Sequence, residues 1–143
     1  ERDFKIFKFR TMRVDAEKDG PQWSLGKKDD RVTAIGKILR RTHLDEMPQL
    51  LNIISGELSF VGPRPERPEF VRQLKKDVPY FELRLLVRPG ITGWAQINYK
   101  YGATVEDAYE KLQYDMYYLK NRSLALDFLV LLRTVKYLFT APK

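Results

Sequence analysis

Apolar residues recur at helical spacing between residues 44 and 54, and this pattern limits the possible folds more than any other feature of the chain. It predicts a helix with one buried apolar stripe, beside which Asp45 and Glu46 lie in the first turn. Pro48 requires the helix to begin close before it, because proline has no N–H to donate inside a helix. The stripe consists of Leu44, Met47, Leu50, Leu51 and Ile54.

Two adjacent carboxylates at a helix start have an ordinary explanation. They complement the positive end of the helix dipole, which contributes about 0.3–1 kcal/mol. Their surroundings favour a second explanation, a role in a functional site, since Arg40 and Arg41 precede them and Pro63, Arg64 and Pro65 follow. An arginine between two prolines is held on a stiff backbone, because each proline fixes its own φ and restricts the residue before it. Such a guanidinium is suited to bidentate binding of phosphate oxygens.

The composition indicates a single domain with an anionic partner. With 143 residues, 43% of them hydrophobic, the chain can bury one core. Its net charge of +7 favours nucleic acid, a phospholipid surface or a phosphorylated small molecule as the partner. The absence of cysteine excludes thiolate metal sites, and a single histidine argues against a histidine site. A metal would therefore be held by carboxylates, which favours magnesium or manganese.

The remaining pattern predicts an α+β fold, a mostly helical single domain around a small β-sheet. The helix at residues 32–41 would bury a stripe of Val32, Ile35, Ile38 and Leu39. Its last turn carries Arg40 and Arg41, which would face the negative end of the dipole. Further helices are expected at residues 66–76, 80–87, 104–121 and from residue 123 onward. Extended segments are expected at residues 4–12, 58–61 and 91–98.

Lys8 and Arg10 share one face of the predicted strand at residues 4–12, since strand side chains alternate with a period of two. Two neighbouring cations fit an edge strand protected by charge, and they fit phosphate binding equally well. We count both residues among the candidate phosphate ligands.

The last two predicted helices begin with start signals. Thr104, with Asp107 three residues later, forms an acidic variant of the capping box, and Ser123 precedes the final helix. From residue 124 to residue 132 almost every residue is apolar, but this run is too short to cross a bilayer. It is either a core helix or an amphipathic interface helix that faces a membrane or a missing part of the protein, and we expect the interface helix.

Five motifs then carry a resemblance to a known family. They are Lys8-Phe9-Arg10-Thr11-Met12, Leu44-Asp45-Glu46-Met47-Pro48-Gln49-Leu50, Phe60-Val61-Gly62-Pro63-Arg64-Pro65, Arg88-Pro89-Gly90-Ile91-Thr92-Gly93-Trp94-Ala95-Gln96 and Tyr114-Asp115-Met116-Tyr117-Tyr118. In this order they resemble the bacterial sugar transferase family, the monotopic polyprenyl-phosphate phosphoglycosyl transferases. The resemblance extends over residues 4–138 and is nearest to the exopolysaccharide type. Because family members carry a hydrophobic segment before the first motif, it implies that residues 1–143 are a catalytic domain truncated at its N-terminus.

The resemblance implies transfer of a sugar-1-phosphate from a UDP-sugar to undecaprenyl phosphate, with release of UMP. It places this reaction at the cytoplasmic face of the bacterial inner membrane, where it would initiate an exopolysaccharide or another surface glycan. Asp45 would be the nucleophile that forms a phosphosugar intermediate, and Asp45 and Glu46 would hold the Mg²⁺ cofactor. Lys8, Arg40, Arg64 and Arg88 match the family's recurrent cations, to which we add Arg10 as a phosphate ligand. Pro63, Pro65 and Asp115 complete the candidate site.

The alternative is a non-catalytic basic module that binds anionic lipid or nucleic acid. The charge and the basic, aromatic C-terminal segment fit both possibilities. Asp45 and Glu46 discriminate between them, because a pure binder gains nothing from two acids inside a basic surface, whereas a magnesium-dependent phosphoryl site requires them. We therefore expect an enzyme that binds no nucleic acid and contacts the membrane through its C-terminal helices and the missing segment. A homo-oligomer is compatible with this prediction.

Overall fold

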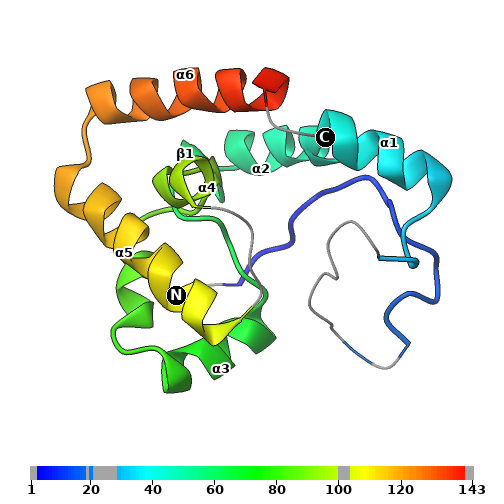
Figure 1. Ribbon diagram of the computed structural model, residues 1–143, viewed down its shortest axis with the longest axis horizontal. Helices are drawn as coiled ribbons and strands as arrows, with labels where there is room; N and C mark the ends of the chain where they lie inside the picture. Colours follow the sequence, from blue (N-terminus) through cyan, green and yellow to red (C-terminus); the bar gives the residue numbers. More distant parts are fainter. Residues whose placement is uncertain (1–2, 19, 21–28, 100–103, 141–143) are drawn as a thin grey trace.

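The computed structural model describes residues 3–18, 20, 29–99 and 104–140, with side chains described as far as residue 137 (Figure 1). The fold is α+β, as predicted, because helices surround a sheet of two short strands. In chain order the elements are α1 (Ala34–Thr42), the 3₁₀-helix η2 (Leu44–Gln49), α2 (Leu50–Ile54), β1 (Ser59–Val61), α3 (Pro68–Asp77), the 3₁₀-helix η3 (Phe81–Leu86), β2 (Gly90–Thr92), α4 (Trp94–Asn98), α5 (Val105–Asn121) and α6 (Leu124–Thr140).

The two strands run parallel, with Ser59 opposite Gly90 and Val61 opposite Thr92. Parallel strands need a crossover connection, which α3 and η3 supply here. Directly after β1 the backbone passes so close to the carbonyl oxygen of Arg88 that a Cβ at Gly62 would overlap it. The loop that follows β1 is therefore fixed against the chain that enters β2.

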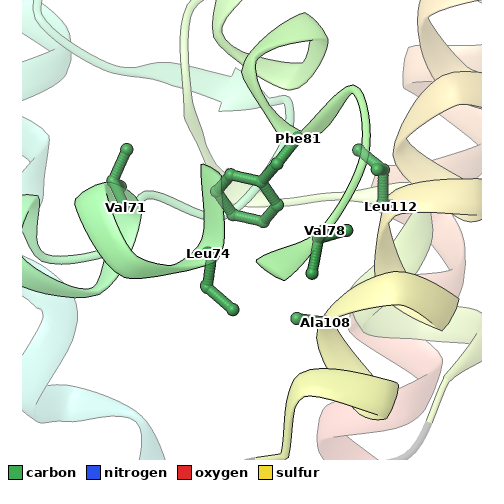
Figure 2. Packing of buried hydrophobic residues seen from close by; sticks show 6 residues of the cluster. All are labelled: Val71, Leu74, Val78, Phe81, Ala108 and Leu112. Atoms are coloured by element: carbon green, nitrogen blue, oxygen red, sulfur yellow. The ribbon is translucent and has the colours of Figure 1, made fainter. Parts of the chain in front are cut away.

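One hydrophobic cluster joins the crossover to α5. Figure 2 shows how its side chains converge from α3, η3 and one face of α5. Phe70 and Met116 pack against the edge of this cluster. Its buried members are Val71, Leu74, Val78, Phe81, Ala108 and Leu112.

A second cluster ties the sheet to the C-terminal helices. Val61 of β1, Tyr118 of α5 and Val130 of α6 are buried together. The Tyr118 hydroxyl donates a hydrogen bond of 2.7 Å to Asp127 of α6, and the Thr92 and Thr134 hydroxyls lie 2.7 Å apart. α6 therefore packs on the sheet along one stripe, and Figure 1 shows it as the uppermost helix of the view.

Several predicted helix starts are confirmed. Thr104 and Asp107 form a reciprocal capping box at the start of α5, which ends at Asn121 as expected. The Ser123 hydroxyl accepts a hydrogen bond from the backbone N–H of Leu126. Pro68 lies in the first turn of α3, where its missing N–H has no consequence.

The predicted strand at residues 4–12 is wrong. Its backbone groups bond to η2 and α2 instead of to a neighbouring strand, as described below, and Met12 makes an isolated antiparallel bridge with Val32. The extended segment at residues 91–98 is right only for its first three residues. After Gly93 the chain turns into α4, whose C-cap N–H bonds to the carbonyl of Ala95.

The predicted buried stripe at residues 44–54 is also wrong, although its residues are helical. Leu51 is 58% exposed and Ile54 is 83% exposed, and the other stripe residues are exposed as well. Of the stripe predicted for the preceding helix, Ile35 and Ile38 are exposed as well, whereas Val32 and Leu39 are half-buried. The apolar spacing thus identifies a shared face correctly, but the described chain supplies nothing to cover that face.

α6 likewise leaves much of its apolar surface uncovered, including Leu124, Phe128 and Leu132. Within the described residues, none of the helices combines the length and hydropathy that a membrane span requires.

Candidate active site

Asp45 and Glu46 lie half-buried on the first turn of η2, directly after the left-handed residue that ends α1. His43 ends α1 in the left-handed conformation, with a φ of 56°, and its N–H bonds to the carbonyls of Arg40 and Leu39. Its side chain makes no capping hydrogen bond. His43 thus ends α1 through its backbone conformation.

Two cations from distant segments meet on Glu46. Lys8 Nζ lies 3.0 Å and an Arg64 guanidinium nitrogen lies 2.6 Å from the same carboxylate oxygen, Oε1. Burial alone would raise the pKa of Glu46, but Arg64 and Lys8 outweigh this effect and lower the pKa to about 2. Glu46 is thus ionised at every physiological pH and holds two cations beside Asp45.

Lys8 is positioned by an amide that the sequence analysis did not single out. Asn52, which is 0% exposed, accepts a hydrogen bond from the N–H of Phe7 and donates one to the carbonyl of Lys5, at 3.0 and 2.7 Å. The N–H of Phe9 bonds to the carbonyl of Asp45 at 3.0 Å. These bonds replace the ladder of a strand and fix the segment on both sides of Lys8. The signal in the sequence was a polar amide inside an otherwise apolar helical run.

Arg40 has a supporting role rather than a place next to Glu46. Its Nε donates a hydrogen bond of 2.8 Å to the hydroxyl of Thr11, and so ties α1 to the segment that carries Lys8. Arg10, on the same segment, is exposed, and no hydrogen bond or ion pair joins its side chain to the described residues. The structure therefore leaves Arg10 able to meet a ligand but does not bring it to the Glu46 cluster.

The loop with the two prolines carries Arg64, whose guanidinium pairs with Glu46. Pro63 is buried and Pro65 is half-buried, so the backbone of the loop is packed while the Arg64 side chain reaches Glu46. The carbonyl oxygen of Arg64 accepts a hydrogen bond of 2.9 Å from a guanidinium nitrogen of Arg84, a residue that the sequence analysis passed over.

Asp115 lies behind this loop and not on the surface of the site, since it is 1% exposed. Its carboxylate pairs with Arg84 at 2.9 Å. Burial raises the pKa of Asp115 to about 6, because the cost of burying its charge exceeds the attraction of the Arg84 guanidinium. Asp115 is thus linked to the backbone of Arg64 only indirectly, through its ion pair with Arg84.

Arg88 is not among the residues that contact Glu46 in the described part of the chain. It lines a polar cavity of about 460 Å³ together with Arg122, Tyr118 and Ser59, and with three apolar residues, Val61, Leu86 and Val87. No carboxylate lines this cavity, and no hydrogen bond or ion pair joins the side chain of Arg88 or Arg122 to the described residues. Two like charges that share a polar cavity favour an anionic occupant.

Asp45 and Glu46 can hold a hard cation only together with oxygen atoms of a bound ligand. Among the described residues, no group of three or more acidic, histidine or cysteine side chains is arranged to hold a metal ion. Asp45 and Glu46 together offer two carboxylates, and magnesium commonly takes one or two protein carboxylates along with phosphate oxygens and water. Asp45 and Glu46 therefore suit a magnesium ion that arrives with a phosphorylated substrate.

Comparison with known proteins gives the class. The chain matches the family described as "Bacterial sugar transferase" over residues 1–141, and it belongs to that family, which confirms the resemblance seen in its motifs.

Among its relatives, the "UDP-N-acetylgalactosamine-undecaprenyl-phosphate N-acetylgalactosaminephosphotransferase" of Aeromonas hydrophila is 43% identical over 139 residues, which cover 97% of this chain and 33% of that protein. The "UDP-glucose:undecaprenyl-phosphate glucose-1-phosphate transferase" of Xanthomonas campestris pv. campestris is 40% identical over 135 residues, or 93% of this chain and 28% of that protein. The protein of the same name from Escherichia coli (strain K12) is 40% identical over 133 residues, or 92% and 28%. The chain thus spans a third or less of the length of these curated relatives.

Proposed function

We propose that the protein transfers a sugar-1-phosphate from a UDP-sugar to undecaprenyl phosphate and releases UMP. The observation that carries this proposal is the meeting of Lys8 and Arg64 on Glu46, directly beside Asp45. Two cations next to a pair of acids suit a reaction at phosphorus, where charge neutralisation matters more than acid–base power. The printed names of the relatives support the same donor and acceptor classes.

The first step is attack by a carboxylate oxygen of Asp45 on the phosphorus that bears the sugar. A bond forms between that oxygen and phosphorus, the bond to the bridging oxygen breaks, and UMP leaves with the electron pair. In the second step a phosphate oxygen of undecaprenyl phosphate attacks the same phosphorus and displaces the Asp45 carboxylate. No net proton is needed, and each step moves one phosphosugar group.

The positive charges lower the repulsion between an anionic nucleophile and an anionic diphosphate. Arg64 can bind phosphate oxygens with its planar fork, and Lys8 supplies a second charge at the same oxygen of Glu46. Asp45 and Glu46 would hold a magnesium ion that arrives with the substrate, and such an ion would supply further neutralisation of the diphosphate charge. The cavity of Arg88 and Arg122 suits a further phosphate group of one of the substrates.

The exposed apolar faces of α1, η2, α2 and α6 support a site that works on a lipid acceptor at a membrane surface. A polyprenyl phosphate keeps its chain in the bilayer, so its phosphate can reach Asp45 only if the domain rests on the headgroups. We place this surface at the inner membrane of a bacterium, on the cytoplasmic face, where UDP-sugars are available.

The test uses the full-length protein with undecaprenyl phosphate and, separately, UDP-glucose and UDP-N-acetylgalactosamine, and it measures UMP release. We expect activity that needs magnesium and that Asp45→Asn abolishes without a loss of melting temperature, because the change is nearly isosteric at a half-buried position. As a matched control, Asp30→Asn removes an exposed carboxylate that lies outside the site and should retain full activity.

Two results would count against the proposal. Full turnover by Asp45→Asn would remove the nucleophile. Binding of anionic lipid without UMP release from any UDP-sugar would favour the non-catalytic module instead.

A further inference from the structure

The buried ion pair between Arg84 of η3 and Asp115 of α5 lies directly behind the loop that carries Arg64. Two nitrogens of the Arg84 guanidinium, Nε and Nη2, each lie 2.9 Å from the same oxygen of Asp115. Nη2 also donates to the carbonyl oxygen of Arg64 at 2.9 Å. Arg84 is 6% exposed, and its guanidinium lies over the ring of Phe81, 5.0 Å from the ring centre. The pair is thus built into the first hydrophobic cluster.

The loop itself offers few backbone donors of its own. Pro63 and Pro65 have no N–H, so between them the backbone offers a single donor and must be held through its carbonyls. The carbonyl of Pro63 accepts from the N–H of Gly90 at 3.0 Å, and the carbonyl of Arg64 accepts from Arg84. The residue that carries the guanidinium is therefore clamped on both sides, by β2 on one side and by a side chain on the other.

Stability alone does not account for the pair. Replacing a buried ion pair by apolar residues of similar volume is often neutral or stabilising, because burying two charges is costly. The Phe81 ring beside Arg84 suits an apolar replacement, and the other neighbour of Arg84, Glu66, whose Oε1 lies 3.9 Å from Nη1, is partly exposed and can be solvated. What apolar residues could not do is donate a hydrogen bond to the carbonyl of Arg64.

We propose that Arg84 and Asp115 are positioning residues, which hold the backbone of Arg64 so that its guanidinium stays on Glu46 and in place for the substrate phosphates. This inference rests on the proposed function for its effect on catalysis, and on geometry alone for its effect on Arg64. Asp115 fixes the orientation of the Arg84 guanidinium, and Arg84 in turn fixes the position of the Arg64 carbonyl. Neither residue touches substrate.

The decisive variant replaces both residues together, as Arg84→Met with Asp115→Leu. It removes both buried charges at similar volume, so the fold should be retained, but it leaves the Arg64 carbonyl without its donor. Val78→Ala is the matched control, because it loosens the same cluster and lowers the melting temperature while leaving the ion pair intact.

The first measurement does not depend on activity. In full-length protein with ¹⁵N-labelled arginine, the Nε signal of Arg64 is assigned by its absence in Arg64→Ala. We expect this signal to broaden or shift in the double variant and to stay unchanged in Val78→Ala. An unchanged Arg64 signal in a folded double variant would overturn the inference, whatever the enzyme does.

The second measurement is a cycle with Arg64→Ala, scored by UMP release. If Arg84 acts through Arg64, the double variant should lower kcat/KM at least tenfold when Arg64 is present and less than threefold when it is alanine. Equal losses in both backgrounds would contradict the inference. Absence of UMP release by the unaltered protein would instead refute the proposed function, while the Arg64 signal would still decide the positioning role.

Discussion

At the scale of single residues, Glu46 couples the charge of the site to the stability of the fold. Its pKa is lowered from 4.5 to about 2, since Arg64 and Lys8 together outweigh the effect of burial. A carboxyl group whose pKa is lower in the folded state stabilises fully above its unfolded value and loses that contribution as the pH falls toward the folded value. The relevant window is therefore between about pH 5 and pH 2.

Glu46→Gln should remove this pH dependence. The difference in the free energy of unfolding between the unaltered protein and the variant should shrink as the pH falls from 5 to 2. Its size is at most about 3 kcal/mol, since one pKa unit corresponds to about 1.4 kcal/mol, and screening at the partly exposed Lys8 reduces it. Denaturant unfolding in the presence of a chelator measures it. Glu82→Gln, an exposed substitution, serves as the control, and parallel curves for Glu46→Gln would contradict the assignment.

Arg64 tests whether the shape of the cation matters in addition to its charge. Lysine keeps the charge but has one nitrogen, which cannot contact Glu46 and two phosphate oxygens with a planar fork. We expect Arg64→Lys to lose at least tenfold in kcat/KM, or about 1.4 kcal/mol, and so to fail to rescue Arg64→Ala. Arg67→Lys, which alters an exposed ion pair with Glu17, should be close to unaltered. Near-normal turnover by Arg64→Lys would mean that a point charge suffices.

At the scale of elements, the contact between α1 and the Lys8 segment depends on one small residue. Gly36 of α1 packs directly on the backbone of Thr11, so that a Cβ there would overlap the Thr11 carbonyl oxygen. Gly36→Ala should therefore push the segment off the helix, even though alanine is the better helix former. We expect a loss of about 1–3 kcal/mol in unfolding free energy.

Activity should fall together with stability in Gly36→Ala, because Lys8 and the Arg40 contact with Thr11 move with the segment. Thermal unfolding and UMP release measure the two effects. Lys37→Ala changes an exposed position of the same helix and should leave both nearly unchanged. A fully stable and active Gly36→Ala would show that the two elements can separate without consequence.

Elements with local signals were predictable from the sequence. The capping box of α5 and Pro68 of α3 depend only on hydrogen bonding within the first helical turn, so they can be predicted without knowledge of the rest of the fold. The face of η2 and α2 was not predictable in the same way. Apolar spacing shows that Leu51 and Ile54 share a side of a helix, but not whether the chain contains something to cover that side.

The site was predictable in part for the same reason. Glu46, Lys8 and Arg64 could be named from residue type and local stiffness, and the structure brings these three together. Asn52 and Arg84 were not predicted as site residues. Their hydrogen bonds join residues that are 45 and 20 positions apart in the sequence. No local pattern encodes such contacts.

At the scale of the whole molecule, three parts of the chain expose apolar side chains that a water-soluble monomer would cover. Figure 1 places α1, α2 and α6 in the upper half of the view. On α6 these residues are followed by Arg133 and Lys136, which suit anionic headgroups. The residues concerned are Ile35, Ile38, Leu44, Met47, Leu50, Leu51, Ile54, Leu124, Phe128 and Leu132.

We expect the domain to bind vesicles that contain anionic phospholipid, and to bind them less tightly as the salt concentration rises. Leu124→Ser and Phe128→Ser should each weaken binding about tenfold or more, since each buried apolar side chain contributes about 1.5–3 kcal/mol. Tyr109→Ser, an exposed aromatic substitution on α5, is the control. Sedimentation with vesicles measures the binding, and its absence at low salt would contradict a membrane-facing surface.

The parallel pairing of β1 with β2 also sets the order in which the molecule can form. A sheet of two strands is marginal by itself, and closing a crossover costs chain entropy before the strands can pair. During synthesis, Arg64 leaves the ribosome well before Gly90, Arg84 and Asp115, the residues that hold its loop. We therefore expect the loop that carries Arg64 to be fixed only after the chain has grown past Asp115. In pulse-labelled hydrogen exchange, the amides of Gly62 and Gly90 should gain protection later than those of α5. The candidate active site would then be the last part of the fold to form.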